Sequence, residues 1–202
     1  MSFDTLILAA GRSERMGSPK ALLNYEGETL LERILRIAHL ATPGKIGLVC
    51  GNVTIRGTLT QAMAEKLSLP ISNNLIITEG KSDGHPIDSI RRGLKALQTK
   101  HRLLLWPVDM AFGSTELIEN LAASFDTTEN KIARPTHDGE HGHPLLFGHQ
   151  AAQELHSPLA DIGAHGVVHH DPSRLIDIPW KDKRVVHPMN TPEQALQCGL
   201  SL

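Results

Sequence analysis

The stretch TLILAAGRSERMGSPKALL, residues 5–23, decides the fold because an apolar strand runs directly into a loop of small and basic residues. Residues 5–8 are a mostly apolar run, typical of a strand buried on both faces of a parallel sheet. In open α/β sheets, ligands bind beyond the carboxyl ends of the strands. The turn at 9–11 exposes amides that attract anions, and Arg15 and Lys20 can neutralise a polyphosphate there. The stretch therefore predicts a phosphate site after the first strand.

The spacing excludes two common phosphate loops. The dinucleotide fingerprint GxGxxG is absent, and so is the Gly-Lys-Ser/Thr of a Walker loop. The alternative interpretation is a solvated basic loop after an ordinary strand. The buried strand, the small-residue turn and the cations together favour a ligand site over that alternative.

Strand-like and helix-like segments alternate as far as about residue 125, which predicts a mostly parallel sheet with right-handed crossovers. The run at 102–108 is the most apolar strand, and we expect it at the centre. Beyond residue 125, short strand candidates predict a partly antiparallel flank on the same domain. Strands are expected at 5–8, 45–50, 74–78, 102–108, 132–135, 144–147, 175–178 and 184–186, and helices at 29–41, 58–67, 87–97, 114–123 and 191–199.

Composition excludes several classes of protein. The 202 residues carry 20 Lys plus Arg and 22 Asp plus Glu, a net charge of −2, so no basic surface for nucleic acid is expected. A hydrophobic fraction of 40% is enough for a core. No run approaches the roughly 20 apolar residues of a membrane span, and Cys50 and Cys198 form no CxxC pair. We expect a reduced, cytoplasmic protein that binds neither nucleic acid nor membrane.

Residues 8–23, LAAGRSERMGSPKALL, resemble the signature LAAGxSxRMGxxKxLL of the nucleotidyltransferases with a glycosyltransferase-A-type fold. The subgroup most resembled is the MobA/MocA-like one, related to molybdenum cofactor cytidylyl- and guanylyltransferases. Motifs at 107–109, 141–147 and 190–193 agree in order. The resemblance implies a Rossmann-like three-layer α/β/α sandwich of the nucleotide-diphospho-sugar transferase type. It forms one domain over 1–202, with a nucleotide-binding half at 1–125 and an acceptor-side half at 126–202.

The resemblance also implies roles for the first loop. Arg15 and Lys20 would be catalytic, holding phosphate oxygens and stabilising charge as pyrophosphate leaves, which suits a reaction catalysed by positioning and charge neutralisation. The other nucleotide-binding positions implied are Leu8, Ala9, Ala10, Gly11, Arg12, Ser13, Gly84 and Ser89.

A Mg²⁺ site is implied by Asp109, which follows the apolar strand, and by Asn190 in the C-terminal motif. Carboxylates suit Mg²⁺, which binds one or two of them together with substrate phosphates. The subgroup has aspartate where this chain has Asn190, so weaker metal binding is expected. In the alternative interpretations, Asp109 is a turn or cap residue and Asn190 only precedes its helix, which leaves a degraded site.

The segment that reads the base in the family departs from the family pattern, and the segment that faces the acceptor follows it. At 80–90, His85, Pro86 and Asp88 stand where relatives have small residues that read the base, so base selectivity is open. The Ala-Ala-Gly turn resembles that of pyrimidine users, which favours CTP over GTP. The segment at 139–147 corresponds to the part of the family that faces the acceptor. Its implied acceptor-binding residues are Gly142, His143 and Pro144.

The leading hypothesis is a Mg²⁺-dependent enzyme. It would move a nucleoside monophosphate from an NTP, with CTP favoured, to a small phosphorylated acceptor such as molybdopterin, releasing pyrophosphate. A second hypothesis is a catalytically weakened nucleotide-binding accessory or regulatory protein of the same fold. A third is a histidine-metal hydrolase that uses His137, His141 and His143, whose spacing fits no common zinc template.

Overall fold

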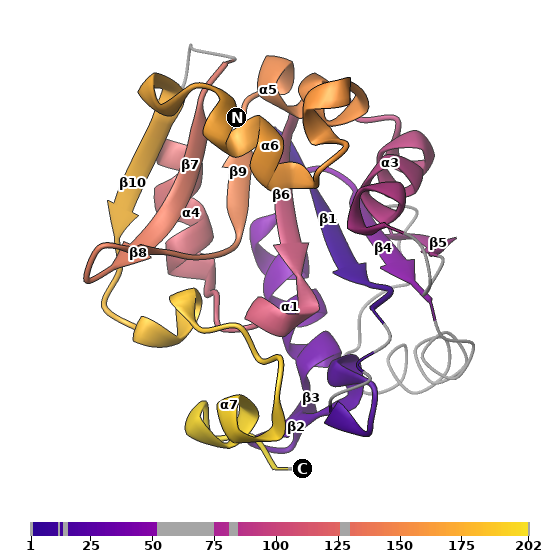
Figure 1. Ribbon diagram of the computed structural model, residues 1–202, viewed down its shortest axis with the longest axis vertical. Coiled ribbons are helices and arrows are strands. Elements are labelled where there is room, and N and C mark those ends of the chain that lie inside the picture. Colours follow the sequence, from indigo (N-terminus) through magenta and orange to yellow (C-terminus); the bar gives the residue numbers. More distant parts are fainter. Residues whose placement is uncertain are drawn as a thin grey trace.

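The computed structural model describes residues 2–11, 13, 16–51, 75–80, 85–125 and 130–201, and Figure 1 shows its central sheet face on. The strands are β1 (Phe3–Ala9), β2 (Asn24–Tyr25), β3 (Glu28–Thr29), β4 (Ile46–Cys50), β5 (Leu75–Glu79), β6 (Arg102–Pro107), β7 (Ile132–His137), β8 (Glu140–His141), β9 (Leu145–Phe147) and β10 (Leu175–Pro179). The α-helices are α1 (Leu30–Ala41), α3 (Pro86–Leu97), α4 (Thr115–Ala123), α5 (His149–Gln153), α6 (Ala164–His170) and α7 (Pro192–Gln197). The 3₁₀ helices are η2 (Lys20–Leu22), η3 (Val108–Met110), η4 (Glu154–His156), η5 (Pro158–Ala160), η6 (Pro172–Arg174) and η7 (Lys183–Val186).

Parallel pairing dominates the sheet, whose order within the described residues is β10-β7-β9-β6-β1-β4-β5, with β8 paired to β7. β6, β1, β4 and β5 are parallel neighbours, and β7 and β10 also pair in parallel. β9 runs antiparallel to both β6 and β7. The predicted parallel sheet with a partly antiparallel flank is therefore confirmed, and the most apolar strand, β6, is central.

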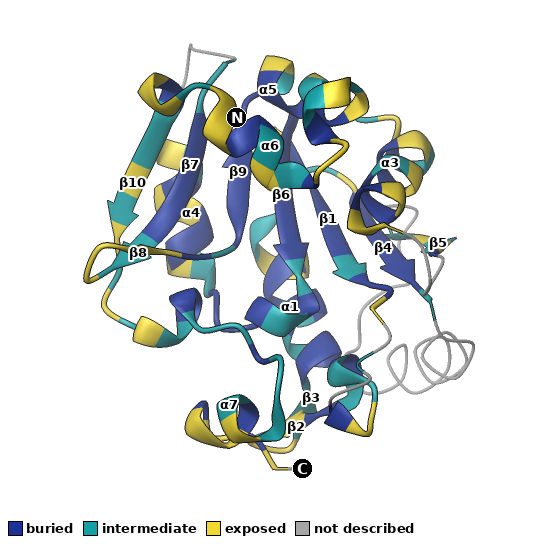
Figure 2. Cartoon of the chain, in the orientation of Figure 1, coloured by how far each residue is buried: buried dark blue, intermediate teal, exposed yellow. Residues whose placement is uncertain are grey.

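Helices cover both faces of the sheet and give the expected three layers (Figure 1). Successive residues of β1 face opposite layers, since Leu6 packs in the cluster that includes α3 and Ile7 in the cluster that includes α1 and α4. Burial on both faces explains why the central strands read as continuous apolar runs, and Figure 2 shows them buried. No helix among the described residues is long and apolar enough to cross a membrane.

Helix α1 begins one residue after the predicted start, because Thr29 is its cap. The Thr29 hydroxyl accepts from the Glu32 amide at 3.2 Å, and the Thr29 amide donates to the Glu32 carboxylate at 2.6 Å. This reciprocal pair satisfies two amides that no helical carbonyl can reach. The Ser114 hydroxyl caps α4 by accepting from the Leu117 amide at 3.1 Å.

Two expectations differ from the structure at the C-terminal end. The strand expected at 184–186 is wrong, because this segment forms the 3₁₀ helix η7 instead. The Asp182 side chain accepts from the Arg184 amide and caps that turn, which a short apolar run does not reveal. The helix expected at 191–199 is shorter, since Thr191 is its cap and Gly199 adopts a φ of 86° beyond its end. The helix expected at 58–67 lies outside the described residues.

An aromatic and guanidinium stack fastens the C-terminal segment to the rest of the molecule. The Tyr25 and Phe112 rings meet edge-on with centroids 5.1 Å apart. The Arg184 Cζ atom lies 4.3 Å from the Phe112 centroid, and its Nη1 donates to the Tyr25 hydroxyl at 2.8 Å. At the other end of α7, the Ser201 amide donates to the Asn24 carbonyl at 2.9 Å. The stretch from η7 through α7 is thus held at both ends.

Gly142 yields a stability prediction. A Cβ atom at this position would stand 2.1 Å from the Val185 carbonyl oxygen, so Gly142→Ala must push η7 away from β8. Overpacking of this kind costs about 1–3 kcal/mol. We expect chemical denaturation to show a loss in that range. Gly11→Ala is the control, because a Cβ there meets nothing within 4 Å. An equal loss in both variants would contradict the packing argument.

Candidate active site

A cavity of about 230 Å³ lies at the carboxyl ends of β1 and β6. This is the edge of the sheet where the sequence predicts a ligand, because parallel strands deliver their following loops to one side. The cavity is lined by Leu8, Ala9, Ala10, Gly11, Ser13, Pro19, Lys20, Ala21, Pro86, Ser89, Pro107, Val108 and Asp109.

Three polar groups from distant parts of the chain meet beside this cavity: Lys20 and Asp109 line it, and Asn190 contacts Lys20. The Lys20 Nζ atom donates to the Asn190 Oδ1 atom at 2.6 Å and lies 3.3 Å from the Asp109 Oδ2 atom. The Lys20 side chain is 15% exposed and that of Asp109 30% exposed. Asp109 and Asn190 stand 89 and 170 residues from Lys20, so only the tertiary fold brings them together.

Backbone contacts hold the two oxygen-bearing residues near each other. The Met189 amide donates to the Asp109 carbonyl at 2.9 Å, which ties the segment before α7 to η3. The Gln194 side-chain oxygen accepts from the amides of Asn190 at 2.8 Å and Thr191 at 3.2 Å. Asn190 therefore precedes its helix, as the alternative interpretation states, and it also turns its side chain to Lys20.

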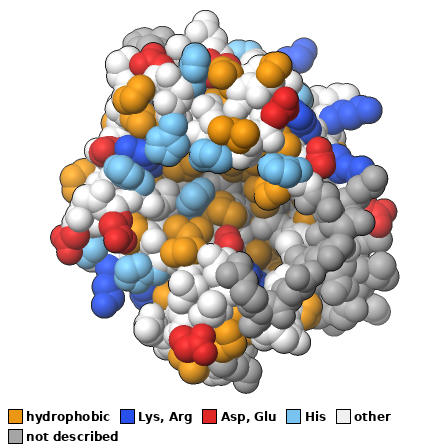
Figure 3. All heavy atoms as spheres, viewed as in Figure 1, with side chains coloured by type: hydrophobic (Ala, Val, Ile, Leu, Met, Phe, Trp, Pro, Cys, Tyr) orange, Lys and Arg blue, Asp and Glu red, His pale blue; other side chains and the backbone are white. Residues whose placement is uncertain are grey.

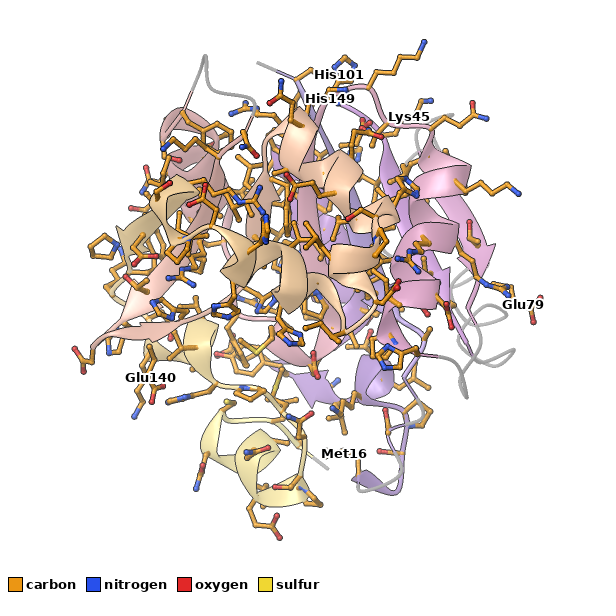
Figure 4. The ribbon with its side chains drawn as sticks, turned by 45° about the horizontal axis from the view of Figure 1, so that its top comes forward. Met16, Lys45, Glu79, His101, Glu140 and His149 are labelled. Carbon is orange, nitrogen blue, oxygen red and sulfur yellow. The ribbon has the colours of Figure 1, made fainter. Side chains whose placement is uncertain are left out.

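Ser13 fixes the backbone from which Lys20 extends. Its hydroxyl accepts from the Lys20 amide at 2.9 Å, and its carbonyl accepts from the Met16 amide at 2.9 Å. Ser13 adopts a φ of 55°, the left-handed region in which a short polar side chain is tolerated. Met16, labelled in Figure 4, is buried and anchors the loop in the core. The sequence did not indicate that the Ser13 hydroxyl would bind the Lys20 amide.

The side of the cavity formed by α3 is tightly packed. Ser89 is 7% exposed and lines the cavity from α3, beside Pro86. A Cβ atom on Gly80 would stand 2.5 Å from the Ala10 Cβ atom, so the chain after β5 approaches the first loop closely. Arg12, Arg15 and Gly84, which the resemblance also implicates, lie outside the described residues.

The expected acceptor residues lie beside η7. The Gly142 amide donates to the Pro135 carbonyl at 2.8 Å, and the His143 amide donates to the Val185 carbonyl at 3.1 Å. Pro144 follows through a cis peptide bond. None of Gly142, His143 and Pro144 is among the described residues that line the cavity.

His143 is held in its neutral form. Its Nδ1 atom is buried and has no hydrogen-bond partner among the described residues. Burial lowers the pKa of His143 to about 4, although the negative charge of Asp109 acts in the opposite direction. The imidazole therefore presents one buried, unpaired ring nitrogen within the electrostatic reach of Asp109.

The other histidines of the predicted cluster turn to separate partners. The His137 Nδ1 atom lies 2.8 Å from the Trp180 carbonyl, and the His141 Nε2 atom lies 3.7 Å from Asp177. Figure 3 shows histidines spread across this face of the molecule. In the described part of the chain, no three His, Cys, Asp or Glu side chains are grouped to hold a metal. The histidine-metal hypothesis is therefore not supported.

The lowered pKa of His143 predicts a pH-dependent stability. Between about pH 6.5 and 4, the unfolded chain binds a proton that the folded chain does not, so the free energy of unfolding falls as pH falls through this window. The full contribution is about 3 kcal/mol, at about 1.4 kcal/mol per unit of pKa. Denaturation of the metal-free protein at pH 7 and pH 4.5 should show a smaller decrease for His143→Gln than for the wild type. His39→Gln changes an exposed histidine and should behave like the wild type; equal decreases in all three proteins would contradict the prediction.

Comparisons with known proteins agree with this geometry. Molybdenum cofactor cytidylyltransferase of Escherichia coli is 29% identical over 146 residues, 72% of this chain and 69% of that protein. Molybdenum cofactor guanylyltransferase of Cupriavidus metallidurans is 25% identical over 197 residues, 92% of this chain and 89% of that protein. With other relatives the match is shorter: the bifunctional protein GlmU of Buchnera aphidicola is 32% identical over 60% of this chain but only 25% of its own length.

Solved structures share the fold. A nucleotidyl transferase from Methanothermobacter superposes with a TM-score of 0.78 at 19% identity, covering 98% of this chain and 95% of that one. A Mycobacterium tuberculosis protein solved as a complex with manganese superposes with a TM-score of 0.69 at 20% identity, covering 98% of this chain and 97% of that one. A family model described as the MobA-like NTP transferase domain matches residues 5–175. With a family match over most of its length and this fold, the chain belongs to the MobA-like NTP transferase family.

Proposed function

We propose that this protein is a metal-dependent nucleotidyltransferase. It moves a nucleoside monophosphate from an NTP to a small phosphorylated acceptor, with molybdopterin as the first candidate, and releases pyrophosphate. The observation that carries the proposal is the convergence of Lys20, Asp109 and Asn190 beside a cavity at the carboxyl ends of β1 and β6. The family and the activities named for its relatives agree with it.

The donor set fits a divalent cation. A carboxylate oxygen of Asp109 and the amide oxygen of Asn190 both face one cationic group, the Lys20 ammonium. Mg²⁺ and Mn²⁺ prefer oxygen ligands, and Mg²⁺ needs only one or two carboxylates when phosphates supply the rest. A bound Mg²⁺ would offset phosphate charge during transfer. The manganese complex of a structural neighbour supports a divalent metal without selecting Mg²⁺.

The chain's own residues would position the reactants. Backbone amides of the turn at 9–11 would bind phosphate oxygens, and Lys20, with Arg12 and Arg15, would neutralise them. An acceptor phosphate oxygen would attack the α-phosphorus in line. The bond from that phosphorus to the bridging oxygen would break, and pyrophosphate would leave with the electron pair. Lys20 would offset the charge that grows on the leaving group.

The substrate assignment follows the division of the chain. Residues 1–125 would bind the nucleotide, and residues 126–202 of the same domain would bind the acceptor through Gly142, His143 and Pro144. The Ala-Ala-Gly turn supports CTP over GTP, and the buried Ser89 is a polar group available to the base. The relatives include both a cytidylyltransferase and a guanylyltransferase.

One observation favours a second candidate, a nucleotide-binding accessory protein that has lost turnover. Asn190 supplies no negative charge, and the single carboxylate of Asp109 already faces an ammonium group. Such a site binds a metal less strongly than two aspartates would. This candidate predicts nucleotide binding without pyrophosphate release.

Substitution of the converging residues tests the mechanism. With CTP, Mg²⁺ and molybdopterin, Lys20→Ala or Asp109→Asn should reduce kcat/KM for pyrophosphate release by about 100-fold or more, since each removes a charge acting on the phosphates. Lys181→Ala removes an exposed ammonium paired with Glu116 and should leave the rate unchanged. Thermal unfolding checks that each variant is folded. Wild-type rates in folded Lys20→Ala and Asp109→Asn would contradict the mechanism.

A panel of nucleotides separates the two candidates. CTP with Mg²⁺ should raise the Tm more than GTP, ATP or UTP, because a ligand that binds only the folded state stabilises it. Pyrophosphate release should then appear with CTP once molybdopterin is added. A larger shift with GTP would reverse the base assignment. Binding without release for every nucleotide and acceptor tried would favour the accessory protein.

A further inference from the structure

The Lys20 ammonium lies where a cation bound by Asp109 and Asn190 would lie. Its Nζ atom is 2.6 Å from the Asn190 Oδ1 atom and 3.3 Å from the Asp109 Oδ2 atom. Both partners of the ion pair are mostly shielded from water, at 15% and 30% exposure, so their attraction exceeds that of a fully solvated pair. In the structure, both oxygens thus contact a cation that the chain itself supplies, the Lys20 ammonium.

A divalent ion and this ammonium would compete for the same two oxygens. An ion bound to both oxygens would sit about 2.0–2.6 Å from each of them. The Nζ atom is already within 2.6–3.3 Å of the same atoms, so the two cations would lie within about 5 Å of each other and would repel each other. Movement of the Lys20 side chain away from the two oxygens would therefore favour metal binding.

The movement needed is confined to the side chain. The Lys20 backbone is fixed, since its amide donates to the Ser13 hydroxyl and it begins the short helix η2. A lysine has a flexible four-carbon stem and three donors, so its ammonium can turn from one set of oxygens to another. Lys20 also lines the cavity, where the phosphates of a nucleotide would offer such oxygens.

We propose that Lys20 acts as an internal counter-ion that blocks the metal site until a nucleotide draws its ammonium onto the phosphates. This rests on the proposed function, because it takes Asp109 and Asn190 as metal ligands. The nucleotide thereby opens the metal site, and metal and nucleotide bind with positive coupling. Linkage makes the effect reciprocal, so a bound metal also strengthens nucleotide binding.

A variant without the ammonium should bind a divalent metal more tightly in the absence of nucleotide. Lys20→Met keeps most of the side-chain length and removes the charge, so it frees the Asp109 carboxylate and ends the repulsion. In the absence of nucleotide, this variant should bind Mn²⁺ at least about ten times more tightly than the wild type. A merely structural ion pair predicts the reverse, because losing it would loosen the site.

The test measures two affinities for the full-length protein by electron paramagnetic resonance of Mn²⁺. The first is for free Mn²⁺ without nucleotide, and the second is for a preformed complex of Mn²⁺ with a non-hydrolysable CTP analogue. Lys20→Met should bind free Mn²⁺ about tenfold more tightly than the wild type, and the nucleotide complex about tenfold less tightly, since its phosphate contact is lost. This opposite ranking is the expected result.

Two further variants serve as controls. Lys181→Met removes an exposed ammonium elsewhere and should match the wild type in both measurements. Adding Asp109→Asn to Lys20→Met should abolish the gain in Mn²⁺ affinity, which assigns the gain to this site. Thermal unfolding confirms that each protein is folded.

The remaining outcomes separate this proposal from the proposed function. In one outcome the wild type binds free Mn²⁺ tightly, and Lys20→Met binds it with equal or lower affinity. That outcome overturns the counter-ion role and leaves the transferase assignment standing. No Mn²⁺ binding by any protein, with or without the nucleotide analogue, overturns both the counter-ion role and the metal-dependent mechanism.

Discussion

The contact of the Lys20 ammonium with the Asp109 carboxylate and the Asn190 amide is the interaction on which the site depends. A carboxylate at the edge of a mostly apolar crevice needs a nearby cation, and a lysine placed there needs an acceptor. Three separate segments meet to satisfy both: the loop after β1, the turn after β6 and the residue before α7. The same two oxygens that hold the lysine are the ones that suit a divalent metal.

The sheet makes this meeting possible because parallel strands end at the same edge. β1 and β6 are adjacent and parallel, so the loop after β1 and the turn that carries Asp109 begin at the same edge of the sheet. The third segment has no strand to place it, and it depends on the stack of Arg184 with Phe112 and on the Met189 amide bonded to Asp109. The position of Asn190 therefore depends both on the stack of Arg184 with Phe112 and on a backbone bond to Asp109, which lines the cavity.

Local patterns in the chain predicted the parts of this molecule that depend on neighbouring residues. The apolar run and turn at 5–23 placed the first strand and its loop, and the apolar pattern at 29–41 placed α1. The strand predicted at 184–186 was wrong, because its two valines suit a buried strand as well as a buried turn. The hydrogen bond by which the Asp182 side chain caps the turn decides between them. Three features could not be predicted, because each depends on residues that are not neighbours in the chain: the pairing of Lys20 with Asn190, the bond from the Lys20 amide to Ser13, and the burial of the His143 Nδ1 atom.

A crystal structure with Mn²⁺ and a non-hydrolysable CTP analogue is the most direct test of the role assigned to Lys20, since the anomalous scattering of manganese locates the ion. We expect the ion between the Asp109 and Asn190 side-chain oxygens, with the Lys20 Nζ atom moved onto phosphate oxygens of the analogue. The contrary result would be a structure with the analogue bound, the Nζ atom still between those two oxygens and the manganese elsewhere. That result would contradict the role assigned to Lys20.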